Sequence, residues 1–181
     1  MSSVVLSGDT SGAITLSAPS VAGTNTLTLP ALTATVMTNK TAGTVLQVVQ
    51  GSVSTGASTT STSDTATGLS VSITPTSSTS KILILFSGNT ASAGTGGYWG
   101  SISIYKNGTT RLIGGQAGTS TGSSAVVQSS LCYLDSPATT SATTYALYFR
   151  SEGNSSTVYL NSPTAVVLTS IATITAMEIA A

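Results

Sequence analysis

Apolar and polar residues alternate in several short stretches of this chain. In LSVSIT (69–74), Leu69, Val71 and Ile73 share one side, and Ser and Thr residues occupy the other. The stretches YWGSISIY (98–105), TTYALYFR (143–150) and TVYLN (157–161) repeat this two-residue period. Such alternation is typical of β-strands that bury one face. Further strands are expected at VLQVVQ (45–50) and ITAMEIA (174–180), and residues that favour helices are scarce.

One stretch, KILILF (81–86), is apolar at successive positions. A strand of this composition is usually covered on both faces. Leu83 and Leu85, which would point away from the core, either lie beneath loops of the same chain or form a subunit interface. We favour the interface, because few charged residues mark a free surface elsewhere.

Turn signals separate these stretches. Asn107-Gly108, inside YKNGTTR (105–111), supplies the two positive-φ positions of a tight type I′ hairpin turn. Further breaks are expected at the Ser-, Gly- and Pro-rich segments 54–68, 87–97, 114–124, 135–142, 151–156 and 161–166. This spacing predicts an all-β sandwich or barrel of about eight to ten strands.

Residues 1–40 differ from the remainder. They contain two similar units, ITLSAP (14–19) and LTLPAL (27–32), each a short strand followed by Pro. Strands this short are marginal on their own, so this β-rich arm should need a partner surface, and residues 41–181 should form the compact domain. The candidate contact residues of the arm are its apolar side chains: Val4, Val5, Leu6, Ile14, Leu16, Leu27 and Leu29.

Composition narrows the possible functions. The 181 residues include five Lys or Arg, five Asp or Glu, one Cys and no His, and 40% are apolar. Zinc sites of the ordinary type and His-based catalysis are therefore excluded, and no basic patch favours nucleic-acid binding. No run of ~18–20 apolar residues indicates a membrane span, and the start lacks a signal-peptide pattern, so export by that route is not expected. Because the last expected strand, 174–180, ends almost at the C-terminus, the full chain is expected to be the mature product. We expect a structural protein that is not an enzyme and has no cofactor or metal.

Few residues suggest site chemistry. A glycosidase needs two carboxylates held close together. The acids of this chain form no close pair in the sequence, although distant acids can still meet in space. They are Asp9, Asp64, Asp135, Glu152 and Glu178. The basic residues Lys81, Lys106, Arg111 and Arg150 are expected to be solvated or to pair with Glu152 and Asp135. Cys132 is expected to be a small buried core residue.

Two aromatic residues stand beside the Asn-Gly hairpin. Trp99 and Tyr105 share the strand face opposite Ile102. An exposed Trp and Tyr could stack on a sugar, with nearby Asn and Thr as hydrogen-bond partners. The alternative is a contact between strands or between subunits.

The chain resembles bacteriophage structural proteins. The arm GDTSGAITLSAPSVAGTNTLTLPALTATVMT resembles N-terminal segments of fibre-like phage proteins. The segments GLSVSITPTSSTSKILI and LDSPATTSATTYALYFRS are similar to a domain of predicted fibre and decoration proteins of marine and cyanobacterial phages. This resemblance implies a virion component, often trimeric, with a jelly-roll-like β-sandwich after the arm.

The expected function is that of a homotrimeric capsid decoration, cement or short head-fibre protein on the outer surface of the capsid. Its arm would dock on the major capsid protein. The first alternative is a tail-fibre or receptor-binding protein that recognises a host surface glycan or protein. The second is a secreted adhesin-like module, which the lack of a signal-peptide pattern disfavours.

Overall fold

The computed structural model describes residues 3–7, 11–17, 20–21, 23–24, 42–94, 99–119, 125–153, 156–161 and 170–181. The secondary structure of these residues is strand without helix, which confirms the all-β prediction. The chain divides into two units, Met1–Val36 and Met37–Ala181. The sequence places this boundary at residue 40.

The first unit contains a two-stranded antiparallel hairpin. Strand β1 (Ser3–Ser7) pairs with β2 (Ala13–Ser17), and Leu6 lies opposite Ile14. The strand expected at 14–19 is therefore β2, and its partner is the segment before it. The similar unit at 27–32 lies outside the described residues.

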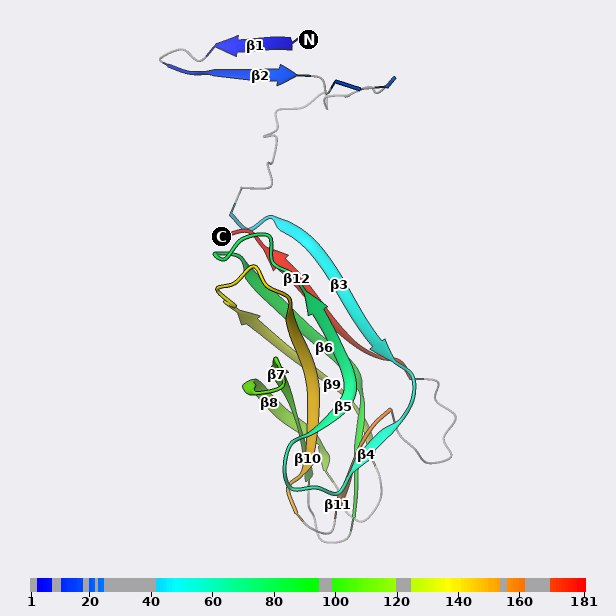
Figure 1. The fold of residues 1–181 in the computed structure, drawn as a ribbon. Helices are drawn as coiled ribbons and strands as arrows, with labels where there is room; N and C mark the ends of the chain where they lie inside the picture. The colour runs from blue at the N-terminus through cyan, green and yellow to red at the C-terminus, as the bar shows by residue number, and fades with distance from the viewer. Residues whose placement is uncertain are drawn as a thin grey trace. The chain divides into compact units, whose positions relative to one another are not determined.

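The second unit forms a sandwich of two antiparallel sheets. Its strands are β3 (Val45–Val53), β4 (Ala57–Thr59), β5 (Thr65–Ile73), β6 (Lys81–Gly94), β7 (Trp99–Lys106), β8 (Thr110–Thr119), β9 (Ala125–Asp135), β10 (Thr143–Ser151), β11 (Ser156–Leu160) and β12 (Ala172–Ile179) (Figure 1).

Two pairs of strands lie in line within the first sheet. β12 pairs with residues 81–87 of β6, and β11 pairs with residues 90–94 on the same side and in the same direction. Between them, the Asn161 N–H donates to the Asn89 carbonyl at 2.9 Å. β3 and β4 also lie in line with each other, because β3 pairs with β12 and β4 pairs with β11. With β9 on the other side of β6, the sheet has four positions: β3/β4, β12/β11, β6 and β9.

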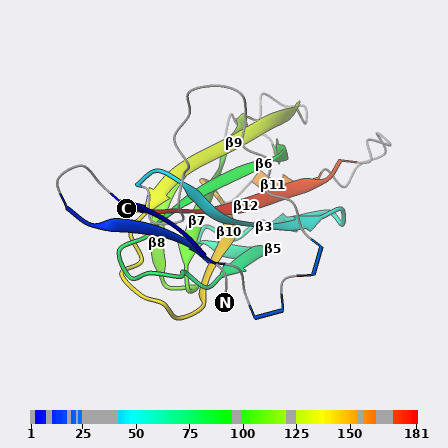
Figure 2. The same cartoon turned by 90° about the horizontal axis from the view of Figure 1, so that it is seen from above.

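The strand order is that of a jelly roll. If β3/β4 and β11/β12 each count as one position, eight positions follow one another along the chain. The first sheet then has the order 1-8-3-6, and the second sheet, β5-β10-β7-β8, has the order 2-7-4-5. Every connection except the β7–β8 hairpin passes between the sheets, as in an eight-stranded double Greek key. Figure 2 shows the two sheets as separate layers.

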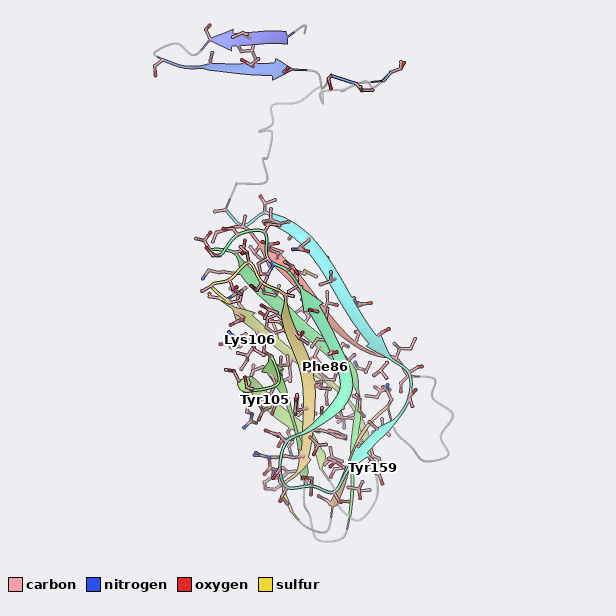
Figure 3. The ribbon with its side chains drawn as sticks, in the orientation of Figure 1. Phe86, Tyr105, Lys106 and Tyr159 are labelled. Carbon is pink, nitrogen blue, oxygen red and sulfur yellow. The ribbon has the colours of Figure 1, made fainter. Side chains whose placement is uncertain are left out.

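The core lies between the sheets and follows the predicted alternation. Leu69, Val71 and Ile73 are buried, and Ser70 and Ser72 between them are exposed. The other large side chains that are fully buried come from both sheets: Phe86 (Figure 3), Ile82, Ile84, Ile102, Ile104, Tyr145, Leu147, Phe149, Leu160 and Ile174. The buried residues thus form one continuous apolar layer.

Three segments expected to be breaks contain strand. β6 continues to Gly94 and β8 to Thr119, while the expected loop 54–68 contains β4 and the start of β5. In β6 the small residues allow close packing rather than a turn. A Cβ on Gly88 would lie 2.9 Å from Cβ of Ala172, so the glycine lets β6 continue across the sheet.

The Asn107-Gly108 hairpin turn is confirmed. Both residues have positive φ, 51° and 70°, as a type I′ turn requires. The turn is also tied to β10, because the Asn107 N–H donates to the Thr144 carbonyl at 2.8 Å and the Thr144 N–H donates to Asn107 Oδ1 at 2.9 Å.

Candidate functional site

The outer face of the first sheet carries an apolar row that crosses all four strand positions. Val48, Met177, Leu83 and Leu134 lie opposite one another in register, one on each of β3, β12, β6 and β9. Val48 and Leu134 are 54% and 50% exposed, and the other two are half-buried. We call this set the apolar row. The next position on β6, Leu85, faces outward beside it.

Charge is nearly absent from this face. Among its described residues, Lys81 at the start of β6 is the one charged side chain whose position in the alternation places it outward. An uncharged apolar surface can pack against another surface without the cost of removing an ion from water. Leu83 and Leu85, the candidate interface residues, therefore belong to a surface suited to association.

The described side chains of the arm are also exposed. Val5 and Leu6 are 55% and 56% exposed on β1. Val4, Ile14 and Leu16 lie in the hairpin by backbone position. The side chains of those three, and residues Leu27 and Leu29 altogether, lie outside the described part of the chain.

The outer face of the second sheet is polar and charged. Arg150 on β10 binds Glu152 through Nη2 at 2.9 Å and approaches Asp64 at 3.9 Å. The Tyr105 hydroxyl donates to Asp64 Oδ2 at 2.5 Å, and its ring packs on Tyr148 with centroids 4.3 Å apart. The hydrogen bond to Asp64 raises the pKa of Tyr105. The two acids are thus brought together around one guanidinium, and the expected Arg150–Glu152 pair is confirmed.

A groove of about 550 Å³ opens on this face beside Trp99. Trp99 is 50% exposed, and a β-bulge lies between it and Ser101. Arg111, Gln116 and Glu152 supply the charged and amide side chains of the lining, and the backbone at Gly100, Gly114 and Gly115 supplies much of the remainder.

The polar groups of the groove are fixed by their neighbours. The Ser101 hydroxyl and Arg150 both donate to Glu152 Oε1. The bond from Ser101, together with that from Arg150, lowers the pKa of the Glu152 carboxyl. The Glu152 N–H donates to the Trp99 carbonyl at 3.0 Å, which holds the backbones of the two residues side by side. Arg111 donates through Nε to Ser103 Oγ at 2.9 Å.

The structure does not bring Trp99 and Tyr105 together as one platform. Six residues along a strand span about 20 Å, and Tyr105 is engaged by Asp64 and Tyr148. Trp99 alone lines the groove. Arg111, Gln116 and Glu152 could not be found from sequence, because they come from β8 and the end of β10 and meet Trp99 only through strand pairing.

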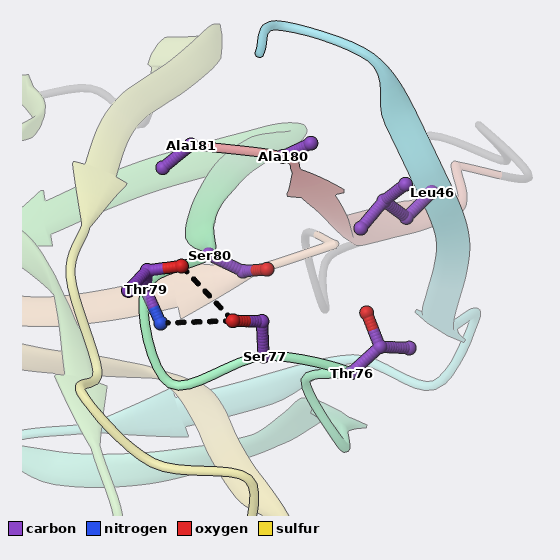
Figure 4. A pocket seen from close by; sticks show the side chains of 7 residues that line it. All are labelled: Leu46, Thr76, Ser77, Thr79, Ser80, Ala180 and Ala181. Atoms are coloured by element: carbon purple, nitrogen blue, oxygen red, sulfur yellow. Dashed lines mark hydrogen bonds between the residues drawn. The ribbon is translucent and has the colours of Figure 1, made fainter. Parts of the chain in front are cut away.

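A second hollow, of about 510 Å³, lies at one end of the sandwich (Figure 4). It is lined by the start of β3, the β5–β6 loop and the last two residues, Ala180 and Ala181. In the loop, the hydroxyls of Ser77 and Thr79 lie 2.9 Å apart within hydrogen-bond distance. The lining side chains are hydroxyl and aliphatic groups without a charged group.

Glu178 lies fully buried near this end, on β12. Its carboxylate accepts hydrogen bonds from Gln47 Nε2 at 2.6 Å and from the Thr76 N–H and hydroxyl at 2.7 and 2.8 Å. Burial raises the pKa of this carboxyl, but the hydrogen bonds outweigh burial and lower it to about 2. The Glu178 carboxylate therefore holds the β5–β6 loop against β12. Because these hydrogen bonds occupy its oxygens, we assign it a structural role.

A further buried acid joins the two sheets. Asp135 on β9 accepts from Lys106 Nζ on β7 at 3.0 and 3.1 Å and from the Tyr145 hydroxyl on β10 at 2.7 Å. Burial, and then the bond to Asp135, raise the pKa of Tyr145. This confirms the expected pairing of Lys106 with Asp135, and it bridges the sandwich.

The position of Cys132 corrects its sequence assignment. The residue is exposed rather than buried. Leu131 points into the core, so the alternation of β9 turns Cys132 outward, opposite Leu85 and beside the apolar row. In SSLCYLD both alternating sets contain apolar residues, and the sequence alone could not decide between them.

The described residues contain no group of three or more Asp, Glu or Cys side chains that could hold a metal ion. Nor do they include a helix with the length and apolar character needed to cross a membrane. No protein-family model matches the chain, and no curated protein matches it either.

Proposed function

We propose that the protein is a non-enzymatic structural component of a virion, a capsid decoration or short head-fibre protein. In this role the arm docks on the major capsid protein, and the jelly-roll sandwich is displayed on the outer surface of the capsid as a homotrimer. The phage resemblance of the sequence supplies the context for this proposal.

The observation that carries the proposal is that both units leave apolar strand residues uncovered. Val5 and Leu6 are exposed on a two-stranded hairpin, which is marginal in water without a partner. On the sandwich, Val48 and Leu134 are half exposed at the two ends of the apolar row. A protein that assembles on a shell and with copies of itself would cover both surfaces.

Deletion of residues 1–36 tests the role of the arm. The shortened protein should remain folded, because the buried core lies in the second unit, and should no longer attach to capsids. The full-length protein should attach and make the shells more resistant to heat and low salt. A shortened protein that still coats capsids would refute the arm as anchor, and virions that lack the protein yet are equally stable would refute a cement role.

Location on the particle separates the proposal from its main alternative, receptor binding. The polar groove beside Trp99 is the observation that favours this alternative. An antibody raised against the sandwich should label the head shell of negatively stained virions. Label at the tail tip would support receptor binding instead, and absence of label on the particle would refute both.

A further inference from the structure

We propose that the groove beside Trp99 is a binding site for a neutral oligosaccharide. The site would add a recognition function to the sandwich. It is independent of the arm and of the apolar row, because the groove is on the outer face of the other sheet. The ligand class follows from three features: the aromatic surface, the fixed polar groups and the charge balance.

Trp99 supplies the aromatic surface. Its side chain is 50% exposed on a face that is otherwise polar. An exposed indole presents a flat apolar ring with one N–H donor at its edge. A pyranose ring matches this surface, because one of its faces consists mainly of C–H groups while hydroxyls project from its rim.

Glu152, Arg111 and Gln116 supply the polar groups around this ring. Arg150 and Ser101 bond the same carboxylate oxygen of Glu152, Oε1, and we assign the other oxygen as an acceptor for a sugar hydroxyl. The guanidinium of Arg111 lies across Gly114, where an added Cβ would be 2.2 Å from Nη2. Groups held in this way lose little freedom when a ligand binds.

The charge balance favours a neutral ligand. The two guanidinium groups of the face, Arg111 and Arg150, are matched by the carboxylates of Asp64 and Glu152. This balance gives no net field to concentrate an anionic polymer. Within the groove lining, Arg111 and Glu152 instead offer donors and acceptors together, which suits hydroxyl groups, since each hydroxyl can donate and accept.

The shape of the surface favours more than one sugar ring. A neighbouring hollow of about 460 Å³ shares Gly115 and Gln116 with the groove and continues to residues 127–131 of β9. The two hollows meet at Gly115 and Gln116 of β8, the strand at the end of the second sheet. We assign the position beside Trp99 to the stacked ring and the continuation to the next ring of the chain.

The experiment uses the single tryptophan of the chain as its reporter. The full-length protein is screened on an array of defined neutral and acidic oligosaccharides. Tryptophan fluorescence is then titrated with lactose, maltose, cellobiose and chitobiose, and with sialyllactose as the acidic comparison. At least one neutral oligosaccharide should bind on the array and shift or quench the emission in a saturable manner, and sialyllactose should bind more weakly than lactose.

Variants locate the site. Trp99→Ala should weaken binding of the best array ligand at least about tenfold, measured by calorimetry, and Gln116→Ala should weaken it by a smaller factor. Ile171→Ala is the matched control and should leave affinity unchanged, because this exposed apolar residue before β12 lines neither hollow and is outside the apolar row. Circular dichroism and the midpoint of thermal unfolding establish that each variant is folded.

Three results would overturn the proposal. The first is the absence of binding and of a fluorescence change up to about 10 mM sugar, a concentration at which even millimolar affinities saturate appreciably. The second is unchanged affinity in folded Trp99→Ala. The third is dissociation of the oligomer by Trp99→Ala, which would assign the indole to a subunit contact. None of these results bears on arm-dependent attachment to capsids, so the two proposals fail separately.

Discussion

The two sheets of the sandwich have similar inner faces and contrasting outer faces. Inside, both bury alternate aliphatic and aromatic residues. Outside, the first sheet carries the apolar row with Lys81 at the start of β6, whereas the second carries Trp99 and a network of arginines, acids and tyrosines. The inner faces are set by the need to form one core. The outer faces are free to differ, and the proposed subunit contact and the proposed sugar site rest on this difference.

A charge placed in the apolar row should have the largest effect. Leu83→Lys puts an ammonium at the centre of the proposed subunit contact, where removing it from water costs several kcal/mol. We expect the proposed trimer to dissociate, as measured by sedimentation velocity, while circular dichroism stays unchanged.

Ser72→Lys is the matched control for that charge. Ser72 is exposed on the outer face of β5, in the second sheet, and the variant should sediment like the unchanged protein. Cys132, the one cysteine of the chain, gives a second measurement. Maleimide should modify it faster in Leu83→Lys than in the unchanged protein, and equal rates would contradict the assignment of this face to a subunit contact.

The next largest effect should come from the acid that joins the two sheets. Asp135→Ala leaves the Lys106 ammonium and the Tyr145 hydroxyl without their shared acceptor. Removing one partner of a buried ion pair costs about 3 kcal/mol, so the free energy of unfolding in urea should fall by about that amount. A loss below about 1 kcal/mol would mean that the bridge does not hold the sheets together.

Acid should weaken the first sheet through Glu178. Its pKa is lowered from 4.5 to about 2 in the folded protein, so its contribution is complete above pH 4.5 and is lost as the pH falls towards 2. A difference of this size corresponds to about 3 kcal/mol. Glu178→Gln should be less stable at pH 7 and should show a smaller decline in stability between pH 4.5 and 2, measured by urea unfolding at each pH.

The smallest effect should come from the surface ion pair of the second sheet. Arg150→Gln removes the partner of Glu152 at a partly exposed position, where such pairs contribute at most about 1 kcal/mol. Its effect on unfolding should shrink further in 0.5 M NaCl, whereas that of Asp135→Ala should persist. Equal losses in the two variants would contradict the distinction between a core bridge and a surface network.

The sequence predicts well which residues of the two sheets face the core and where the tight hairpin turn lies. The alternation at residues 69–73 and 145–149 identifies the buried side chains, and Asn107-Gly108 identifies the hairpin. These signals are local, because burial and turn geometry depend on neighbouring residues. The same rules fail at residues 87–94 and 114–119, where small residues continue strands instead of ending them.

Which outward-facing residues become neighbours depends on the register of strand pairing, and this register cannot be read from the sequence. KILILF reveals Leu83, but its neighbours Val48, Met177 and Leu134 become a row only when four strand positions are aligned. Likewise, Trp99 can be recognised as an aromatic candidate, whereas its association with Glu152 depends on β7 pairing with β10. Long-range pairing therefore limits what could be predicted about both candidate surfaces.

The in-line arrangement of β11 and β12 has a consequence for engineering. β11 ends at Leu160 and β12 begins at Ala172 on the same line of the sheet, and each is bonded separately to β6. A peptide epitope or small reporter domain inserted between these anchors would interrupt neither ladder. If the sandwich is carried on a shell, this joint offers a position for displaying foreign cargo in many copies.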